Sequence, residues 1–260
     1  MSAILSVRDL AKTFGPVVAA RDITLDIPAC QIVGVIGANG AGKTTFVNMV
    51  TGHLRPSRGS IRFEDRDITG LPSRRITRLG ISRSFQVAQV FPSLTVFDNM
   101  CAATAVARGT DSMLKRALTP LRSRATLDEA EAAIELFRIA SFRNARSATL
   151  PQGVRKLLDI AMATVGAPRV LMLDEPTSGI SVEEKFDVMD VVMSALRSRN
   201  MTVLFVEHDM EIVSRFAERV LAFYDGAVIA DGAPAVALAD PRVQMLISGT
   251  KPAAVEAADA

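Results

Sequence analysis

The segment Gly37–Thr44, with the sequence GANGAGKT, constrains this chain more than any other feature. It fits the pattern G-x-x-x-x-G-K-[ST], in which glycines let the backbone turn its N–H groups toward phosphate oxygens. A short apolar run, Gln31–Ile36, precedes the segment, and residues Lys43–Thr51 continue it with helical spacing. A buried strand, a glycine-rich turn and a helix in this order predict a phosphate-binding loop, or P-loop, at a helix N-terminus.

The loop residues have distinct predicted roles toward ATP. Lys43 would place a positive charge between the β- and γ-phosphates, and the Thr44 hydroxyl would bind Mg²⁺. The residues of this segment that we expect to bind the nucleotide are Gly37, Asn39, Gly40, Ala41, Gly42, Lys43, Thr44 and Thr45.

Two carboxylates follow a second buried strand. The apolar run Val170–Leu173 ends at Asp174 and Glu175, as a strand that runs into a cleft would present them. Asp174 can hold Mg²⁺ directly or through a water molecule, and Glu175 can polarise an attacking water as the general base. An acidic pair after a strand is common, but together with the P-loop it predicts a metal and hydrolysis site.

The order of apolar patterns predicts an α/β fold. An amphipathic helix over Val182–Ser198 separates the buried strands Val170–Leu173 and Thr202–Val206, which implies a largely parallel sheet covered by helices. The stretches Leu5–Leu10 and Ile23–Ile27 alternate instead, as strands at the edge of a sheet do.

Helical spacing dominates the middle of the chain. We expect a mostly helical subdomain over about 94–165, inserted into a single domain that spans 1–250, and a flexible Ala-rich tail over 251–260. Basic residues gather within the helical part, where a solvated face or loop is the first interpretation and contact with lipid headgroups an open alternative. These residues are Lys115, Arg116, Arg122 and Arg124.

Composition excludes some classes of function. Lys plus Arg number 30 against 28 Asp plus Glu, so the charge balance gives no reason to expect a nucleic acid partner. No run of about 18 apolar residues occurs, so we do not expect the chain to cross a membrane. We expect it in the cytoplasm, with any membrane contact made through other proteins.

These motifs resemble those of the ABC ATPase family over nearly the whole chain. The resemblance implies a RecA-like P-loop NTPase core with an antiparallel β subdomain and an inserted helical subdomain, and ATP held between two subunits. Phe14 matches the aromatic residue that stacks on adenine, with core packing as the alternative. Gln86 matches the glutamine that contacts Mg²⁺ and the lytic water, and His208 the histidine that reaches the γ-phosphate. Catalytic roles are thus implied for Gln86 and His208 beside Glu175.

Three stretches are similar to the ATPases of branched-chain amino acid importers: Gly80–Gln86, Leu94–Met100 and Val206–Met210. The similarity implies import of branched-chain amino acids or of a related small amide or acid. It also implies two permease subunits, a periplasmic solute-binding protein and a second, related ATPase as partners. The chain would then lie at the cytoplasmic face of the inner membrane.

The signature motif of the family, L-S-G-G-Q, is altered here to the sequence LPQGV over Leu150–Val154. In the family this motif caps the γ-phosphate bound to the opposite subunit. Pro151 offers neither a hydroxyl nor an N–H group, whereas Gly153 keeps its N–H. Loss of such a donor slows the site on the partner chain, so the resemblance favours an asymmetric heterodimer over a homodimer.

Three alternatives stay open. An exporter ATPase, for lipid or lipopolysaccharide, is one, and the sequence Ser84-Phe85-Gln86 argues modestly against it. A non-transport ABC protein of DNA repair or ribosomes would usually carry a coiled-coil insert or two cassettes in one chain, and neither is evident. A regulatory subunit with little turnover is the third, because of Pro151.

Overall fold

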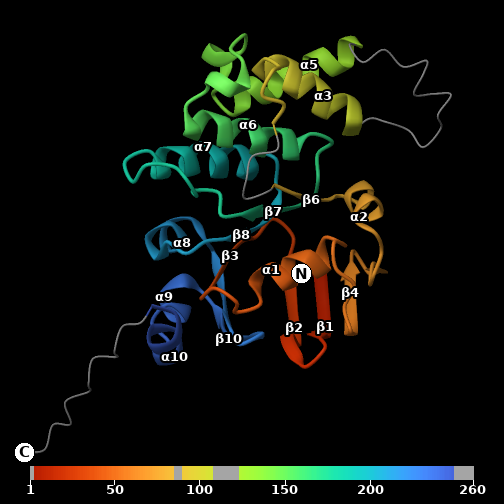
Figure 1. Ribbon diagram of the computed structural model, residues 1–260, viewed down its shortest axis with the longest axis vertical. Coiled ribbons are helices and arrows are strands. Elements are labelled where there is room, and N and C mark those ends of the chain that lie inside the picture. The colour runs from red at the N-terminus through yellow and green to blue at the C-terminus, as the bar shows by residue number, and fades with distance from the viewer. Residues whose placement is uncertain (1–2, 85–89, 108–122, 249–260) are drawn as a thin grey trace, which may run out of the picture.

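Two β-sheets and the helices around them build the fold (Figure 1). The computed structural model describes residues 3–84, 90–107 and 123–248. One sheet has four strands in the order β2-β1-β4-β5, and the other has six in the order β10-β9-β3-β8-β7-β6.

The six-stranded sheet carries the core. Its strands are β3 (Ile32–Gly37), β6 (Ile81–Arg83), β7 (Val170–Asp174), β8 (Thr202–Val206), β9 (Arg219–Tyr224) and β10 (Ala227–Gly232). All neighbours pair in parallel except β10, which forms an antiparallel hairpin with β9. Every residue of β3, β7 and β8 is buried, because helices cover both faces of a parallel sheet. The carboxyl ends of these strands therefore lie at one edge, where loops can form a site.

The smaller sheet is antiparallel. It consists of β1 (Ala3–Phe14), β2 (Val17–Pro28), β4 (Arg58–Phe63) and β5 (Arg66–Asp67). The two alternating stretches noted in the sequence lie within β1 and β2, and Leu10 pairs with Ile23 in their register. The apolar face of this sheet packs around α1 (Lys43–Val50), where Phe46 is fully buried. This contact holds the first helix after the glycine-rich loop between the two sheets.

The remaining helices complete the molecule. They are α2 (Ser73–Leu79), α3 (Val96–Ala107), α5 (Arg124–Leu136), α6 (Gln152–Thr164), α7 (Lys185–Ser198), α8 (Met210–Phe216), α9 (Pro234–Ala237) and α10 (Pro241–Val243), with short helices η1 (Ala140–Phe142), η2 (Ser147–Thr149) and η3 (Gln244–Ser248). Figure 1 shows α3, α5 and α6 grouped together at one end, with α7 between them and the six-stranded sheet. Buried residues of these helices join one apolar core with β7 and β8.

The helix predicted over Val182–Ser198 begins later than expected. Its helical part starts at Lys185, and the Val182 side chain is 68% exposed. The Ser181 hydroxyl accepts a hydrogen bond from the Glu184 backbone N–H, and the Lys185 N–H donates to the Ser181 carbonyl oxygen, so residues 182–184 form a turn that leads into the helix. The predicted start was therefore wrong by three residues, while the inward apolar positions Met189 to Leu196 are buried.

The predicted fold class is confirmed: the chain is α/β, with the arrangement of a RecA-like P-loop NTPase. No helix among the described residues is long and apolar enough to cross a membrane. Several sequence predictions lie outside the described residues, namely those for Gln86, for Lys115, Arg116 and Arg122, and for the tail over 251–260.

Candidate nucleotide-binding and active site

The glycine-rich loop joins the end of β3 to the start of α1, and two of its glycines cannot be replaced without strain. Gly42, the N-cap of α1, has φ +102°, and a Cβ there would lie 2.8 Å from the Ala19 carbonyl oxygen. A Cβ on Gly37, with φ +152°, would lie 2.4 Å from the Phe223 carbonyl oxygen. Backbone carbonyl groups of β2 and β9 therefore lie too close to this loop for a side chain, and only glycine fits at both positions.

Lys43 lies under the loop with its side chain turned inward. It is 6% exposed, and its Nζ donates hydrogen bonds to the carbonyl oxygens of Gly37 at 2.6 Å and Ala38 at 2.9 Å. Burial lowers the pKa of Lys43, while the negative charges of Glu175 and Asp174 act in the opposite direction. A bound anion would offset the cost of keeping this ammonium desolvated, which suits a phosphate ligand.

A cavity of about 230 Å³ opens over the loop. The residues that line it are Asn39, Gly40, Ala41, Gly42, Lys43, Thr44, Thr45, Glu175, Val206 and His208. The structure thus brings the P-loop together with two of the predicted catalytic side chains. Helix α1 also points its N-terminus at this cavity, where backbone N–H groups and the helix dipole favour an anion.

Glu175 and His208 face each other across the cavity. Their Oε1 and Nε2 atoms are 2.9 Å apart, and their side chains are 23% and 43% exposed. Glu175 has φ +46°, and its N–H donates to the Val206 carbonyl oxygen at 3.0 Å. A left-handed backbone at a non-glycine residue is strained and is common at functional sites, and here it directs the carboxylate into the cavity.

A buried carboxylate that sequence reasoning missed ties the two catalytic loops together. Glu207, 4% exposed, accepts hydrogen bonds at Oε1 from the N–H and the hydroxyl of Thr177, at 3.0 and 2.6 Å. Its Oε2 accepts from the His208 N–H at 3.2 Å. The loop after β7 is therefore held against the loop after β8. Its position in the sequence, as a charged residue directly after the apolar strand Thr202–Val206, could have indicated a functional role for Glu207.

Asp174, the last residue of β7, lies in a buried ion pair with Arg83 of β6. Arg83 Nη2 donates to Asp174 Oδ2 at 2.5 Å, and Nη1 donates to Asn48 Oδ1 at 2.5 Å. The two charged side chains are 10% and 11% exposed. Asp174 was predicted to lie at the site, and it comes directly before Glu175 in the chain but does not itself line the cavity. No sequence pattern predicted a role for Arg83.

The described side chains fit Mg²⁺ rather than a metal held by the protein alone. Among residues 3–84, 90–107 and 123–248, no three His, Cys, Asp or Glu side chains gather at a possible metal site. Mg²⁺ needs fewer protein ligands, because it binds through one or two oxygen ligands together with phosphates and water. Asp174 and the exposed Thr44 hydroxyl are ligands of this kind.

Phe14 and Gly153, also predicted to bind nucleotide, do not line the cavity at the P-loop. Phe14 is 50% exposed at the end of β1, with the Lys12 ammonium 5.0 Å from its ring, so the alternative of core packing is wrong. Gly153 lies in the first turn of α6, which packs against α7, where a Cβ would lie 3.1 Å from Val188 Cγ2. Pro151 is the N-cap of α6 with an extended ψ of 151°.

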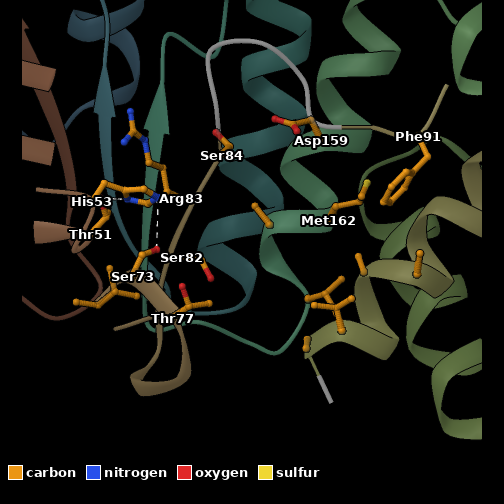
Figure 2. Close-up of a pocket in the computed structure, with 17 residues that line it drawn as sticks. Thr51, His53, Ser73, Thr77, Ser82, Arg83, Ser84, Phe91, Asp159 and Met162 are labelled. Atoms are coloured by element: carbon orange, nitrogen blue, oxygen red, sulfur yellow. Dashed lines mark hydrogen bonds between the residues drawn. The ribbon is translucent and has the colours of Figure 1, made fainter. Parts of the chain in front are cut away.

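A second cavity, of about 480 Å³, lies beside β6 between α2, α3 and α6 (Figure 2). His53 and Arg83 lie next to each other in one wall, while Asp159 and Phe91 lie across from them. The His53 ring is 3.0 Å from the Thr51 hydroxyl, and burial, followed by the Arg83 charge, lowers its pKa. No motif or apolar pattern in the sequence predicted this cavity.

Comparisons with known proteins place these features in a family. The sequence profile described as ABC transporter matches residues 20–178. The chain is 35% identical over 234 residues, covering 89% of it and 92% of the relative, to the high-affinity branched-chain amino acid transport ATP-binding protein BraF of Pseudomonas aeruginosa. It is 30% identical over 249 residues, covering 96% and 98%, to the lipopolysaccharide export system ATP-binding protein LptB of Acidithiobacillus ferridurans.

The fold agrees with these sequence matches. The ADP conformation of MJ1267, an ATP-binding cassette of an ABC transporter, superposes with a TM-score of 0.84 at 26% identity, covering 96% of this chain and 100% of MJ1267. The sequence profile, the relatives and the architecture agree, and the chain therefore belongs to the ABC transporter family of ATPases.

Proposed function

We propose that this chain is the ATP-hydrolysing subunit of an ABC importer for branched-chain amino acids or a related small amide or acid. One observation carries the enzymatic part of the proposal: a single cavity places Lys43 of the P-loop beside the Glu175–His208 pair. A triphosphate held on the loop would thus have a carboxylate and an imidazole beside it.

The proposed roles follow from the chemistry of each group. Lys43 and the loop N–H groups bind the phosphates, and Glu175 accepts a proton from the attacking water. His208 shares a hydrogen bond with Glu175 and reaches toward the γ-phosphate. Thr44, Asp174 and Gln86 would hold Mg²⁺, which neutralises phosphate charge when bound. Phe14, exposed at the β1–β2 turn, would stack on adenine.

The site is completed by a second subunit. Gly153 belongs to a helix that packs on α7 and does not line the cavity at the P-loop of its own chain, which favours a role for its N–H toward a nucleotide on another chain. Pro151 starts that helix without a donor. We therefore propose a heterodimer with a second, related ATPase, in which the cavity described here is the active site and the partner's site is slow.

Import is favoured over export by the stretches shared with importer ATPases and by the 35% identity with BraF. The 30% identity with LptB keeps lipopolysaccharide export as the second candidate. As an importer subunit, the chain would bind two permease subunits at the cytoplasmic face of the membrane and receive solute from a periplasmic binding protein.

Two measurements test the proposal. The purified full chain should bind ATP with Mg²⁺, and Lys43→Ala should abolish the binding; equal binding by the variant would contradict the phosphate site. Disruption of the gene should then abolish uptake of radiolabelled leucine, isoleucine or a small amide, and the companion periplasmic protein should bind the same solute. Normal uptake with lipopolysaccharide missing from the cell surface would identify the exporter instead.

A further inference from the structure

We infer that Arg83 is a positioning residue for Asp174, which it holds in the orientation that Mg²⁺ requires. The inference rests on the proposed function, because it concerns the metal that accompanies ATP. It adds a residue on β6, 91 positions away from Asp174 in the chain, to which the proposed function assigns no contact with nucleotide or metal.

The contact is a fixed one. Arg83 uses its two terminal nitrogens on different partners: Asp174 on β7 and Asn48 on α1, both at 2.5 Å. β6 and β7 are paired in parallel, with Arg83 opposite Met172, so the backbone holds the guanidinium near the end of β7. The planar guanidinium therefore sets the angle of the Asp174 carboxylate relative to α1, the helix that carries Thr44.

Burial of the ion pair restricts the orientation of the Asp174 carboxylate. Both side chains are about nine-tenths buried, where a hydrogen-bonded pair has few alternative rotamers and water competes poorly for its atoms. The bond engages Oδ2 of Asp174, so Oδ1 is the oxygen that can face the metal. Partners that orient a metal-binding carboxylate in this way typically change metal affinity by about 10- to 100-fold when they are removed.

A purely structural ion pair makes a different prediction. Removing one member of a buried pair generally destabilises the fold, because it leaves a buried charge without compensation. Such a loss would weaken ATP binding with and without Mg²⁺ alike. A positioning role instead weakens only the part of the affinity that Mg²⁺ adds, and this difference is the basis of the test.

The experiment measures the affinity of the full chain for a non-hydrolysable ATP analogue by calorimetry, in Mg²⁺ and in EDTA. The ratio of the two dissociation constants is the Mg²⁺-dependent gain. Arg83→Gln should lower this gain by about tenfold while leaving the affinity in EDTA within about twofold. Arg83→Lys keeps the positive charge but lacks the planar guanidinium that can bond two partners at once. Its Mg²⁺-dependent gain should lie between that of the wild type and that of Arg83→Gln. Arg75→Gln, on the exposed face of α2, is the matched control and should change neither value.

Each outcome decides the inference. An unchanged gain in Arg83→Gln, or an equal loss of affinity in Mg²⁺ and in EDTA, would overturn it. If Arg83→Gln yields no folded protein, Arg83→Lys alone decides: a reduced gain with normal affinity in EDTA supports the inference, and an unchanged gain refutes it. Absence of binding by the wild type under both conditions would instead refute the proposed function.

Discussion

His208 Nε2 lies 2.9 Å from Glu175 Oε1, so residues at the ends of two paired strands share one hydrogen bond above the P-loop. The strand order places β7 beside β8, and the pairing of Asp174 with Val206 brings Glu175, one residue past β7, and His208, two residues past β8, to the same cavity. The bond orients the carboxylate before any nucleotide arrives, which lowers the cost of assembling the site for hydrolysis.

Glu175→Gln should reduce ATP turnover of the assembled complex by at least about 100-fold, because an amide cannot accept the proton of the attacking water. ATP binding should persist, since Lys43 and the loop are unchanged, and the two ATPase subunits should stay associated in ATP during size-exclusion chromatography. Glu183→Gln, an exposed change nearby, serves as the control. Normal turnover in Glu175→Gln would rule out Glu175 as the base.

His208→Ala and Glu175→Gln should not have additive effects on turnover. His208→Ala removes one partner of the hydrogen bond, and Glu175→Gln removes the carboxylate whose orientation that bond sets, so the second change in the double variant has less left to disrupt. The free energy of coupling, obtained from the four ATPase rates of a double-mutant cycle, should exceed about 0.5 kcal/mol. Strict additivity would indicate that the two side chains act independently.

Lys43→Met should leave the melting temperature of the nucleotide-free chain at least as high as that of the wild type, and it should abolish the rise that ATP causes. Burial lowers the pKa of Lys43, so the unfolded chain binds this proton more tightly than the folded chain does. The resulting cost in stability is fully present at neutral pH, below the lowered pKa, and it declines as the pH rises toward the ordinary value of 10.5.

The melting temperatures of both proteins at about pH 7 and about pH 9.5 test this pH dependence. The melting temperature of the wild type should rise relative to that of Lys43→Met as the pH rises, because the cost of burying the charged lysine declines. A nucleotide-free Lys43→Met that melts more than about 4 °C lower, corresponding to about 1 kcal/mol or more in a chain of this size, would mean that the bonds to Gly37 and Ala38 support the fold.

In the heterodimer that we propose, Pro151→Ser should raise the ATPase rate by up to about twofold, because a hydroxyl and an N–H would return to the site proposed to be slow. Serine is also a better N-cap than proline for α6, so the change should not harm folding. Pro151→Ala restores the N–H alone, so comparing it with Pro151→Ser distinguishes the contribution of the hydroxyl from that of the N–H. An unchanged rate in Pro151→Ser would count against the asymmetric heterodimer.

Much of the site could be predicted from the sequence, because the features that carry it are local. Gly37 and Gly42 report backbone conformations that other residues do not adopt, and an apolar run that ends in Asp174 and Glu175 marks a strand end. The start of α7 was predicted three residues early, because residues 182–184 form a turn that leads into the helix and their apolar spacing already looks helical. Gln86 and the signature-motif residues remain predictions about contacts with metal and partner.

The sequence by itself determined the loop, the strand ends and the order of α and β elements, because these follow from the periodicity and conformational limits of adjacent residues. Only the tertiary structure decided that Arg83 meets Asp174 and that Glu207 holds Thr177 beside His208. Those contacts join residues 91 and 30 positions apart, and they exist because the sheet places β6, β7 and β8 side by side. Strand order is set by the packing of the whole core, which no short stretch of sequence specifies.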